Sequence, residues 1–382
     1  METTIKHLEK LISLGDIYIL EPTGNYSKLW VNTLLDAGKE VRIVPNTSLP
    51  PYRQLCGWDF KDDEHDAVAL AYYGWLNRNN LTAFNSIRHP EIYSIYQQFL
   101  EHNRINQELT PLINRARNLL HTEFPEAKNS KTESSDKIDG IWLFLAGKNL
   151  SQRQQTFWKN RLNKSIGSAT KFGFSLEIMR LAKTICDLKQ RRNEIKKDFE
   201  EVLSNSKYKF YNEAFDKFSL GIYDRIIFLC QIFPFEQFLD ENGSELRTIK
   251  PKKISPSGKP NTKRVGLNRF HARLGKAVKP WSSGKKKGHI VTGTNLVRVQ
   301  LYLWVKRNMV MTKHKSLPPR IKELRDRYHN DLGLNPNQLP GQQSAKMEKR
   351  SLKQWAKARV GDKLVKLLFK ELIGTYRREK QE

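Results

Sequence analysis

Cysteine is scarce in this sequence, and long apolar runs are missing from it. The chain has 3 Cys among 382 residues: Cys56, Cys186 and Cys230. They lie far apart and lack Cys-x-x-Cys spacing, which argues against a disulfide framework or a cysteine zinc site. No stretch approaches the roughly 18 consecutive apolar residues of a membrane span. The first residues lack the basic-then-apolar order of a signal peptide. The sequence therefore predicts a cytoplasmic protein without a membrane partner.

Acidic residues are also few relative to basic ones. The chain has 67 Lys and Arg against 40 Asp and Glu, a formal net charge of +27. A surplus of this size favours a polyanionic partner over a merely soluble basic protein, and nucleic acid over an anionic membrane surface. Residues 251–289 alone contain 12 Lys and Arg and no Asp or Glu. We expect this segment to lie against an anion.

The first 90 residues have the pattern of an α/β domain. The runs DIYIL and EVRIV predict two strands, and residues 25–38 between them have helical spacing. A right-handed crossover of this length joins parallel strands, so we predict a βαβ unit within residues 1–90.

The rest of the chain reads as mainly helical. Residues 91–210 predict two long amphipathic helices, which form either an antiparallel or intermolecular coiled coil or a plain helical bundle. Residues 211–382 predict a mixed, mainly α domain that ends in a basic amphipathic tail.

Carboxylates stand at two conspicuous places in the first domain. Glu21 ends the first predicted strand, and in open α/β sheets functional sites form at the carboxyl ends of strands. Asp63 and Asp66 are neighbours at the start of a predicted helix, on a side that Ala67 and Leu70 continue toward the core. Two like charges on an inward face suit Mg²⁺ between them, since Mg²⁺ prefers oxygen ligands.

Structural roles remain open for the same carboxylates. Glu21 alone is compatible with a simple strand-to-helix loop, and Asp62 or Asp63 is a suitable N-cap for the helix. His65 has no second histidine at ligand spacing, so we predict a surface residue.

Three stretches together resemble a known family: LEPTGNYSKLW, AGKEVRIVPN and KDDEHDAVALA. They are similar to the amino-terminal domain of the insertion-sequence one-ten family of DEDD transposases, which are related to Piv-type DNA invertases. The family pattern is Glu-x-Thr-Gly, then Lys-x-Asp-x-x-Asp-Ala; Glu21, Lys61, Asp63 and Asp66 match it. The resemblance implies a RuvC-like (RNase H-like) fold and a catalytic, Mg²⁺-binding role for the three carboxylates. The family's first aspartate has no counterpart here, so we expect that carboxylate and its leading strand or strands to be missing.

A second resemblance lies in KPWSSGKKKGHIVTGTNLVRVQLYLW, which is similar to the family's carboxy-terminal transposase domain. It implies that Ser283 is the nucleophile, with matching flanks at Gly284, Gly293, Asn295 and Arg298. Ser282 and Ser257 remain alternatives. The residues alone favour a flexible, basic DNA-binding loop without chemistry, whereas the resemblance favours the nucleophile. The stretch FSLGIYDRIIFLC is similar to a further family element, with Tyr223 where a second glycine is usual.

Cations around the serine are the predicted nucleic-acid contacts. They are Lys285, Lys286, Lys287, Arg298, Arg269 and Arg273. Lysines beside the serine would hold a phosphate and stabilise charge in the transition state.

The resemblance implies a DNA transposase or site-specific recombinase. It would act through a serine and a Mg²⁺-binding acidic cluster, on element ends and target DNA, with a structured guide RNA, as a homodimer or homotetramer near the nucleoid. Two alternatives are a catalytically inactive, truncated transposase that only binds DNA or RNA, and a nuclease of Holliday-junction type.

Overall fold

The structure is mostly helical and divides into two compact units. It is a computed structural model and describes residues 4–24, 26–46, 48–55, 57, 62–80, 83–85, 87–127, 137–169, 174–254, 260–283, 286–311, 317–333 and 349–381. Unit 1 ends at Ser94 and unit 2 begins at Ile95. Unit 2 contains residues 95–210 together with residues 211–382. The sequence predicted a boundary near residue 210, between a helical middle region and a carboxy-terminal domain.

Unit 1 is built around two short parallel strands. β1 (Ile17–Leu20) pairs with β2 (Glu40–Ile43), with Ile17 opposite Glu40. The helix α2 (Tyr26–Asp36) connects them. This is the βαβ unit that the apolar runs predict, and its parallel pairing is confirmed.

Helices cover both faces of this sheet. One cluster consists of Val31, Leu34 and Val41, with Tyr18, Leu20 and residues of α1 (Ile5–Ser13) against them. The other joins α3 (Leu49–Leu55) and α4 (Asp63–Leu76) to Ile19 through Val44, Leu49, Ala69 and Tyr73. The change of face between Tyr18, Ile19 and Leu20 is the alternation expected of a strand.

A glycine sets the distance between α4 and β1. A Cβ atom at Gly74 would lie 2.7 Å from Cγ1 of Ile19. The helix that begins with Asp63 therefore approaches the strand before Glu21 as closely as a glycine allows.

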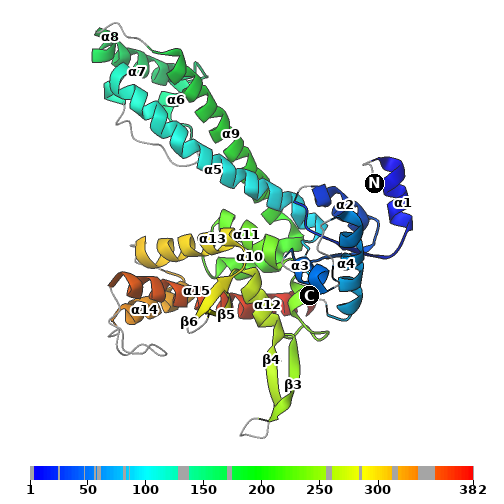
Figure 1. The fold of residues 1–382 in the computed structure, drawn as a ribbon. Coiled ribbons are helices and arrows are strands. Elements are labelled where there is room, and N and C mark those ends of the chain that lie inside the picture. Colours follow the sequence, from blue (N-terminus) through cyan, green and yellow to red (C-terminus); the bar gives the residue numbers. More distant parts are fainter. Residues whose placement is uncertain are drawn as a thin grey trace. The chain divides into compact units, whose positions relative to one another are not determined.

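Unit 2 contains a long antiparallel helix pair (Figure 1), formed by α5 (Pro90–Glu123) from Ile95 onward and α9 (Leu176–Ser204). Contacts join the start of one helix to the end of the other: Gln98 with Asp198 at 3.0 Å, Glu101 with Arg191 at 2.8 Å, and Arg115 with Glu177 at 2.8 Å. Several buried positions of α5 follow coiled-coil spacing: Ile95, Phe99, His102, Leu109, Ala116 and Leu120; buried Ile105 lies outside this spacing. The pair therefore forms within one chain.

Short helices cap the far end of this pair (Figure 1). They are α6 (Gly140–Leu145), α7 (Gln152–Asn163) and α8 (Ile166–Ala169). A buried ion pair ties them to α9, because Nζ of Lys189 lies 2.8 Å from Oδ2 of Asp139 and both side chains are at most 6% exposed. The same oxygen accepts a hydrogen bond from Nε1 of Trp142 at 3.0 Å. A charge pair buried this deeply is stable only while both partners remain.

The remainder of unit 2 packs around an aromatic core. Its helices are α10 (Lys209–Asp216), α11 (Ile222–Ile232), α12 (Val265–Arg273), α13 (Asn295–Val305), α14 (Pro319–Gly333) and α15 (Lys349–Gln381), with a π-helical stretch at Lys306–Met311. Phe235, Phe238, Phe270 and Phe369 are fully buried against one another. None of the described helices is long and apolar enough to cross a membrane.

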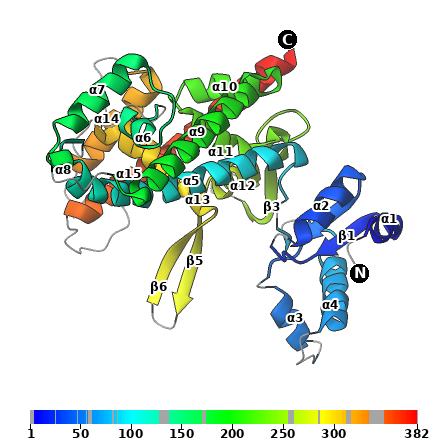
Figure 2. The same ribbon diagram turned by 90° about the horizontal axis from the view of Figure 1, so that it is seen from above.

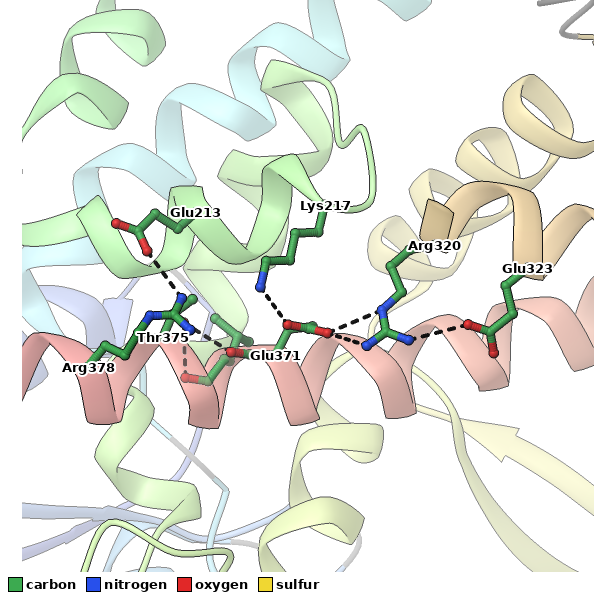
Figure 3. Close-up of polar contacts among 8 residues, drawn as sticks. Glu213, Lys217, Arg320, Glu323, Glu371, Thr375 and Arg378 are labelled. Atoms are coloured by element: carbon green, nitrogen blue, oxygen red, sulfur yellow. Dashed lines mark hydrogen bonds and ion pairs between the residues drawn. The ribbon is translucent and has the colours of Figure 1, made fainter. Parts of the chain in front are cut away.

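A carboxylate on α15 bridges two other helices (Figure 3). Glu371 accepts hydrogen bonds from Lys217, the C-cap of α10, at 2.7 Å and from Arg320 of α14 at 2.6 Å. Burial alone would raise the pKa of Glu371, but these two cations outweigh it and hold the pKa below its usual range.

The basic segment around residues 251–289 is not a loop. It forms the hairpin β3 (Arg247–Ile254) with β4 (Pro260–Arg264), the helix α12, and the hairpin β5 (Ala277–Ser283) with β6 (Lys286–Thr292). Figure 2 shows β5 and β6 extending away from the helices of unit 2. A flexible loop was the interpretation left open by the sequence, and the structure corrects it for the described residues.

Tyr223 of α11 stacks on His102 of α5. Their ring centroids are 4.1 Å apart at an interplanar angle of 21°. Burial, with a smaller contribution from the charge of Arg192, lowers the pKa of His102 to about 4. The tyrosine that departs from the family's glycine pattern thus has a packing role, and its partner ring is neutral.

We expect Lys189→Met to destabilise unit 2 by about 3–5 kcal/mol, since it leaves the Asp139 carboxylate buried and unpaired. Lys196→Met on the same helix is the control; its ion-pair partner Glu200 is 58% exposed, so the loss should stay within about 1 kcal/mol. Urea unfolding followed by circular dichroism measures both. Equal losses in the two variants would contradict the role of the buried pair.

We also expect the free energy of unfolding to fall as pH drops from about 6.5 toward 4. In this range the unfolded chain protonates His102 near the ordinary pKa of 6.5, while the folded chain resists until about 4. His102→Gln should lose this part of the pH dependence. Urea unfolding at a series of pH values tests it, with exposed His329→Gln as the control. A slope unchanged by His102→Gln would be the contrary result.

Candidate functional site

Glu21 directly follows β1, at the carboxyl end of the small sheet. The N–H of Thr23 donates to the carbonyl of Glu21 at 3.1 Å, and Gly24 has φ of 67°, a conformation that favours glycine. The Pro-Thr-Gly turn therefore starts at the glutamate, as the sequence suggested. The Glu21 residue is half-buried.

Asp62 caps α4 and so accounts for one acidic residue of the motif. Its carboxylate accepts from the N–H of His65 at 2.8 Å and also pairs with the His65 ring. These hydrogen bonds lower the pKa of Asp62. The sequence predicted a surface position for His65. Its side chain is 45% exposed, but its ring also pairs with the Asp62 carboxylate. Asp63 and Asp66 are not needed for this cap.

The inner side of α4 differs from the prediction. Asp66 is 8% exposed and lies on the same side as buried Ala69 and Tyr73, whereas Asp63 and Ala67 are exposed. Asp66, Ala69 and Tyr73 follow one another at intervals of three and four residues. They share one face because a helix turns once every 3.6 residues. The expectation that Asp63 would turn inward beside Ala67 is therefore wrong.

A guanidinium that sequence reasoning missed lies beside Asp66. Nη1 of Arg53, on α3, is 3.1 Å from Oδ1 of Asp66. That oxygen is buried and forms no hydrogen bond with the part of the chain that the structure describes. The pair compensates a buried charge, but leaves the oxygen with unused acceptor capacity.

The three predicted carboxylates fit a magnesium ion by donor type. Among the described residues, no three acidic, His or Cys side chains gather as a group able to hold a metal ion. Mg²⁺ commonly takes only one or two carboxylates and completes its shell with water and substrate phosphates. The unbonded Oδ1 of Asp66 is a hard, buried oxygen of the required kind.

Ser283 is the last residue of β5, at the tip of the second hairpin. The register places Ser283 opposite Lys286 and Ser282 opposite Lys287. Both serines thus face strand positions occupied by lysine. Ser282 is exposed.

Four of the residues singled out from the sequence lie outside the described residues: Lys61, Ser257, Gly284 and Lys285. In the described part of the hairpin, β5 ends at Ser283 and β6 begins at Lys286.

Two glycines close the base of the hairpin. Gly275 has φ of 70° and Gly293 has φ of 113°. A Cβ atom at Gly293 would lie 2.6 Å from Cα of Gly275, and one at Gly275 would lie 2.7 Å from Cγ of Arg298. The segment that follows α12 and the segment that precedes α13 are therefore in direct contact at these two glycines, where they cross. Gly293 was expected from the family flank, whereas Gly275 was missed because its contact is distant in sequence.

The predicted arginines have different surroundings. Arg269 is exposed on α12, and Arg273 donates to Oε1 of Gln237 at 3.2 Å. Arg298 donates to Oδ1 of Asn295 at 3.4 Å, within the first turn of α13. Asn295 and Arg298, which the family match pairs, are thus in contact.

The chain matches one family model, described as a transposase (DEDD, IS110), over residues 7–125. No curated protein matches it. The match covers β1, β2 and α4 and thus holds the three predicted carboxylates. It confirms the resemblance noted in the sequence and implies DNA as the partner. Residues 7–125 of the chain are therefore similar to the IS110 family of DEDD transposases.

Proposed function

We propose that this transposase cleaves and rejoins DNA with Ser283 as nucleophile and with Glu21, Asp63 and Asp66 as Mg²⁺-binding carboxylates. The observation that carries the proposal is the position of Ser283. It ends β5 at the tip of a hairpin built from a stretch with 12 Lys and Arg and no Asp or Glu. A phosphate backbone would be drawn to this hairpin, and the register puts a lysine opposite the serine.

The proposed fold of unit 1 is RuvC-like (RNase H-like). In support, β1 and β2 are parallel, Glu21 follows β1 directly, and α4 packs on β1 through Gly74. Sites in such sheets form at the carboxyl ends of the strands. The bound metal would supply charge neutralisation and activation of an oxygen nucleophile.

In the proposed reaction the Ser283 oxygen bonds to a DNA phosphorus and loses its proton. The bond from phosphorus to one strand end breaks, and the freed strand oxygen takes up a proton. A hydroxyl of a second strand then attacks the same phosphorus and releases the serine. Lys286 and Lys287 would stabilise the negative charge on the phosphate oxygens.

Three further parts of the proposal come from family resemblance: a structured guide RNA, assembly as a dimer or tetramer, and action of the carboxylates of one copy on the serine of another. The charge of +27 suits a protein that holds RNA as well as DNA. The carboxylates belong to unit 1 and the serine to unit 2, so both units must contribute.

We expect Ser283→Ala to abolish the covalent protein–DNA adduct while leaving DNA binding within about twofold, because one uncharged hydroxyl contributes little to counterion release. Denaturing gels with end-labelled element DNA measure the adduct. Ser282→Ala is the matched control, one residue away on the same strand. Adducts that survive in Ser283→Ala but vanish in Ser282→Ala would move the nucleophile to Ser282. Adducts that survive in both variants would contradict a nucleophile at either serine.

We expect Asp66→Asn to reduce Mg²⁺-dependent strand cleavage by roughly 100-fold or more while DNA binding persists. Asp62→Asn is the control, since Asn is also a good N-cap. Mixing Asp66→Asn with Ser283→Ala tests assembly: recovered cleavage would support sites shared between copies. An intact chain that binds DNA but never cleaves it would instead favour a catalytically inactive nucleic-acid binder.

A further inference from the structure

A pocket of about 470 Å³ lies at the base of the serine hairpin, where β5 begins. Its size falls within the range of about 300–1,000 Å³ that is usual for small-molecule sites. Its walls come from the start of β5, from α13 and from α15. The lining residues are Gly275, Lys276, Arg298, Leu301, Tyr302, Val305, Gln354, Lys357, Ala358 and Gly361.

The floor of this pocket is apolar. Leu301 and Val305 of α13 are 2% and 1% exposed, and Gly361 of α15 lies against Leu301. A Cβ atom at Gly361 would lie 3.1 Å from Nζ of Lys276. The glycine thus makes room for the Lys276 side chain to run along α15. An apolar surface favours an aromatic ring over water.

The walls are cationic. Lys276, Arg298 and Lys357 line the pocket, and among the described residues its lining contains no Asp or Glu. The nearest acidic partner is Asp362, 3.2 Å from Nζ of Lys276. Three cations around an apolar floor suit an anion that also carries a ring.

Tyr302 supplies an aromatic surface at the rim. Its side chain is 48% exposed. Nζ of Lys357 lies 5.1 Å from the ring centroid and 3.4 Å from the hydroxyl, which holds the ring in place. Aromatic rings beside cations are the usual stacking platform for single nucleotides.

We propose that this pocket holds one unstacked nucleotide of the bound DNA, with its base on Tyr302 and the apolar floor and its phosphate among the three cations. A free phosphate would not use Leu301 and Val305, and an apolar side chain of a protein would not use the cations. The pocket also adjoins the crossing of Gly275 and Gly293, at which the hairpin joins the helices of unit 2. Nucleic acid lying along the hairpin would pass it.

Photo-crosslinking tests the location. The full-length protein is bound to element-end DNA in which thymines are replaced, one at a time, by 5-iodouracil; RNA carrying 5-iodouracil is run in parallel. We expect irradiation to join one DNA position to Tyr302, identified by mass spectrometry of the digested adduct. A crosslink to Tyr302 only from RNA would overturn the assignment to DNA. Crosslinks that all map away from the pocket would overturn the proposal.

Affinity measurements test the energetics at that DNA position. Tyr302→Ala should weaken DNA binding by roughly 5- to 100-fold, the range for loss of a stacked base, and Tyr302→Phe should not. Removing the base at the crosslinked position should cause the same loss in the wild type and no additional loss in Tyr302→Ala. Independent, additive losses would refute a contact between that base and Tyr302.

Two controls separate this site from general charge and from catalysis. Lys322→Ala removes an exposed cation on α14, outside the pocket, and Tyr26→Ala removes an exposed ring in unit 1. Neither should change the crosslink. The binding assays contain no Mg²⁺, and Ser283→Ala should crosslink like the wild type. If the proposed serine chemistry is wrong, nucleotide binding in the pocket can still be tested by crosslinking. If the crosslink to Tyr302 does not form, the proposed role of Ser283 is not affected.

Discussion

Scarcity of carboxylates governs how this chain is held together. The chain has 40 acidic residues against 67 basic ones, and most of the acids with little exposed surface bind cations from other segments. These pairs are Asp139 with Lys189, Asp224 with Arg307, Glu245 with Arg264, Asp331 with Arg359, and Glu371 with Lys217 and Arg320. Each pair fixes one element to another at a cost in desolvation. The surplus cations remain for the surface, where a polyanion partner can use them.

The sequence predicted those parts of the fold that short-range patterns determine. The two apolar runs located β1 and β2, and the position of Glu21 after β1 followed from the end of its run. The contact of Arg53 with Asp66 could not be predicted, because it depends on how α3 packs against α4. The direction of Asp63 was missed for a related reason, since the core decides which helical face is buried.

The serine hairpin was beyond prediction from local pattern. Its strands contain three Lys, two Ser, one Pro and one Gly among their residues and lack the apolar alternation that identifies a strand. The hairpin depends on the crossing of Gly275 and Gly293, which are 18 positions apart. Arg298 was expected near the serine from the family match, yet its packing against Gly275 and its place in the pocket wall are visible only in three dimensions.

That crossing has a mechanical consequence. Both strands of the hairpin start from the contact between Gly275 and Gly293. The distance from the helices of unit 2 to Ser283 therefore depends only on strand length. β5 has seven residues, which corresponds to a reach of roughly 20 Å at about 3.3 Å per residue. Adding or removing residue pairs would change this reach in steps without disturbing the helices. The length of the hairpin therefore sets how far Ser283 stands from the helices of unit 2.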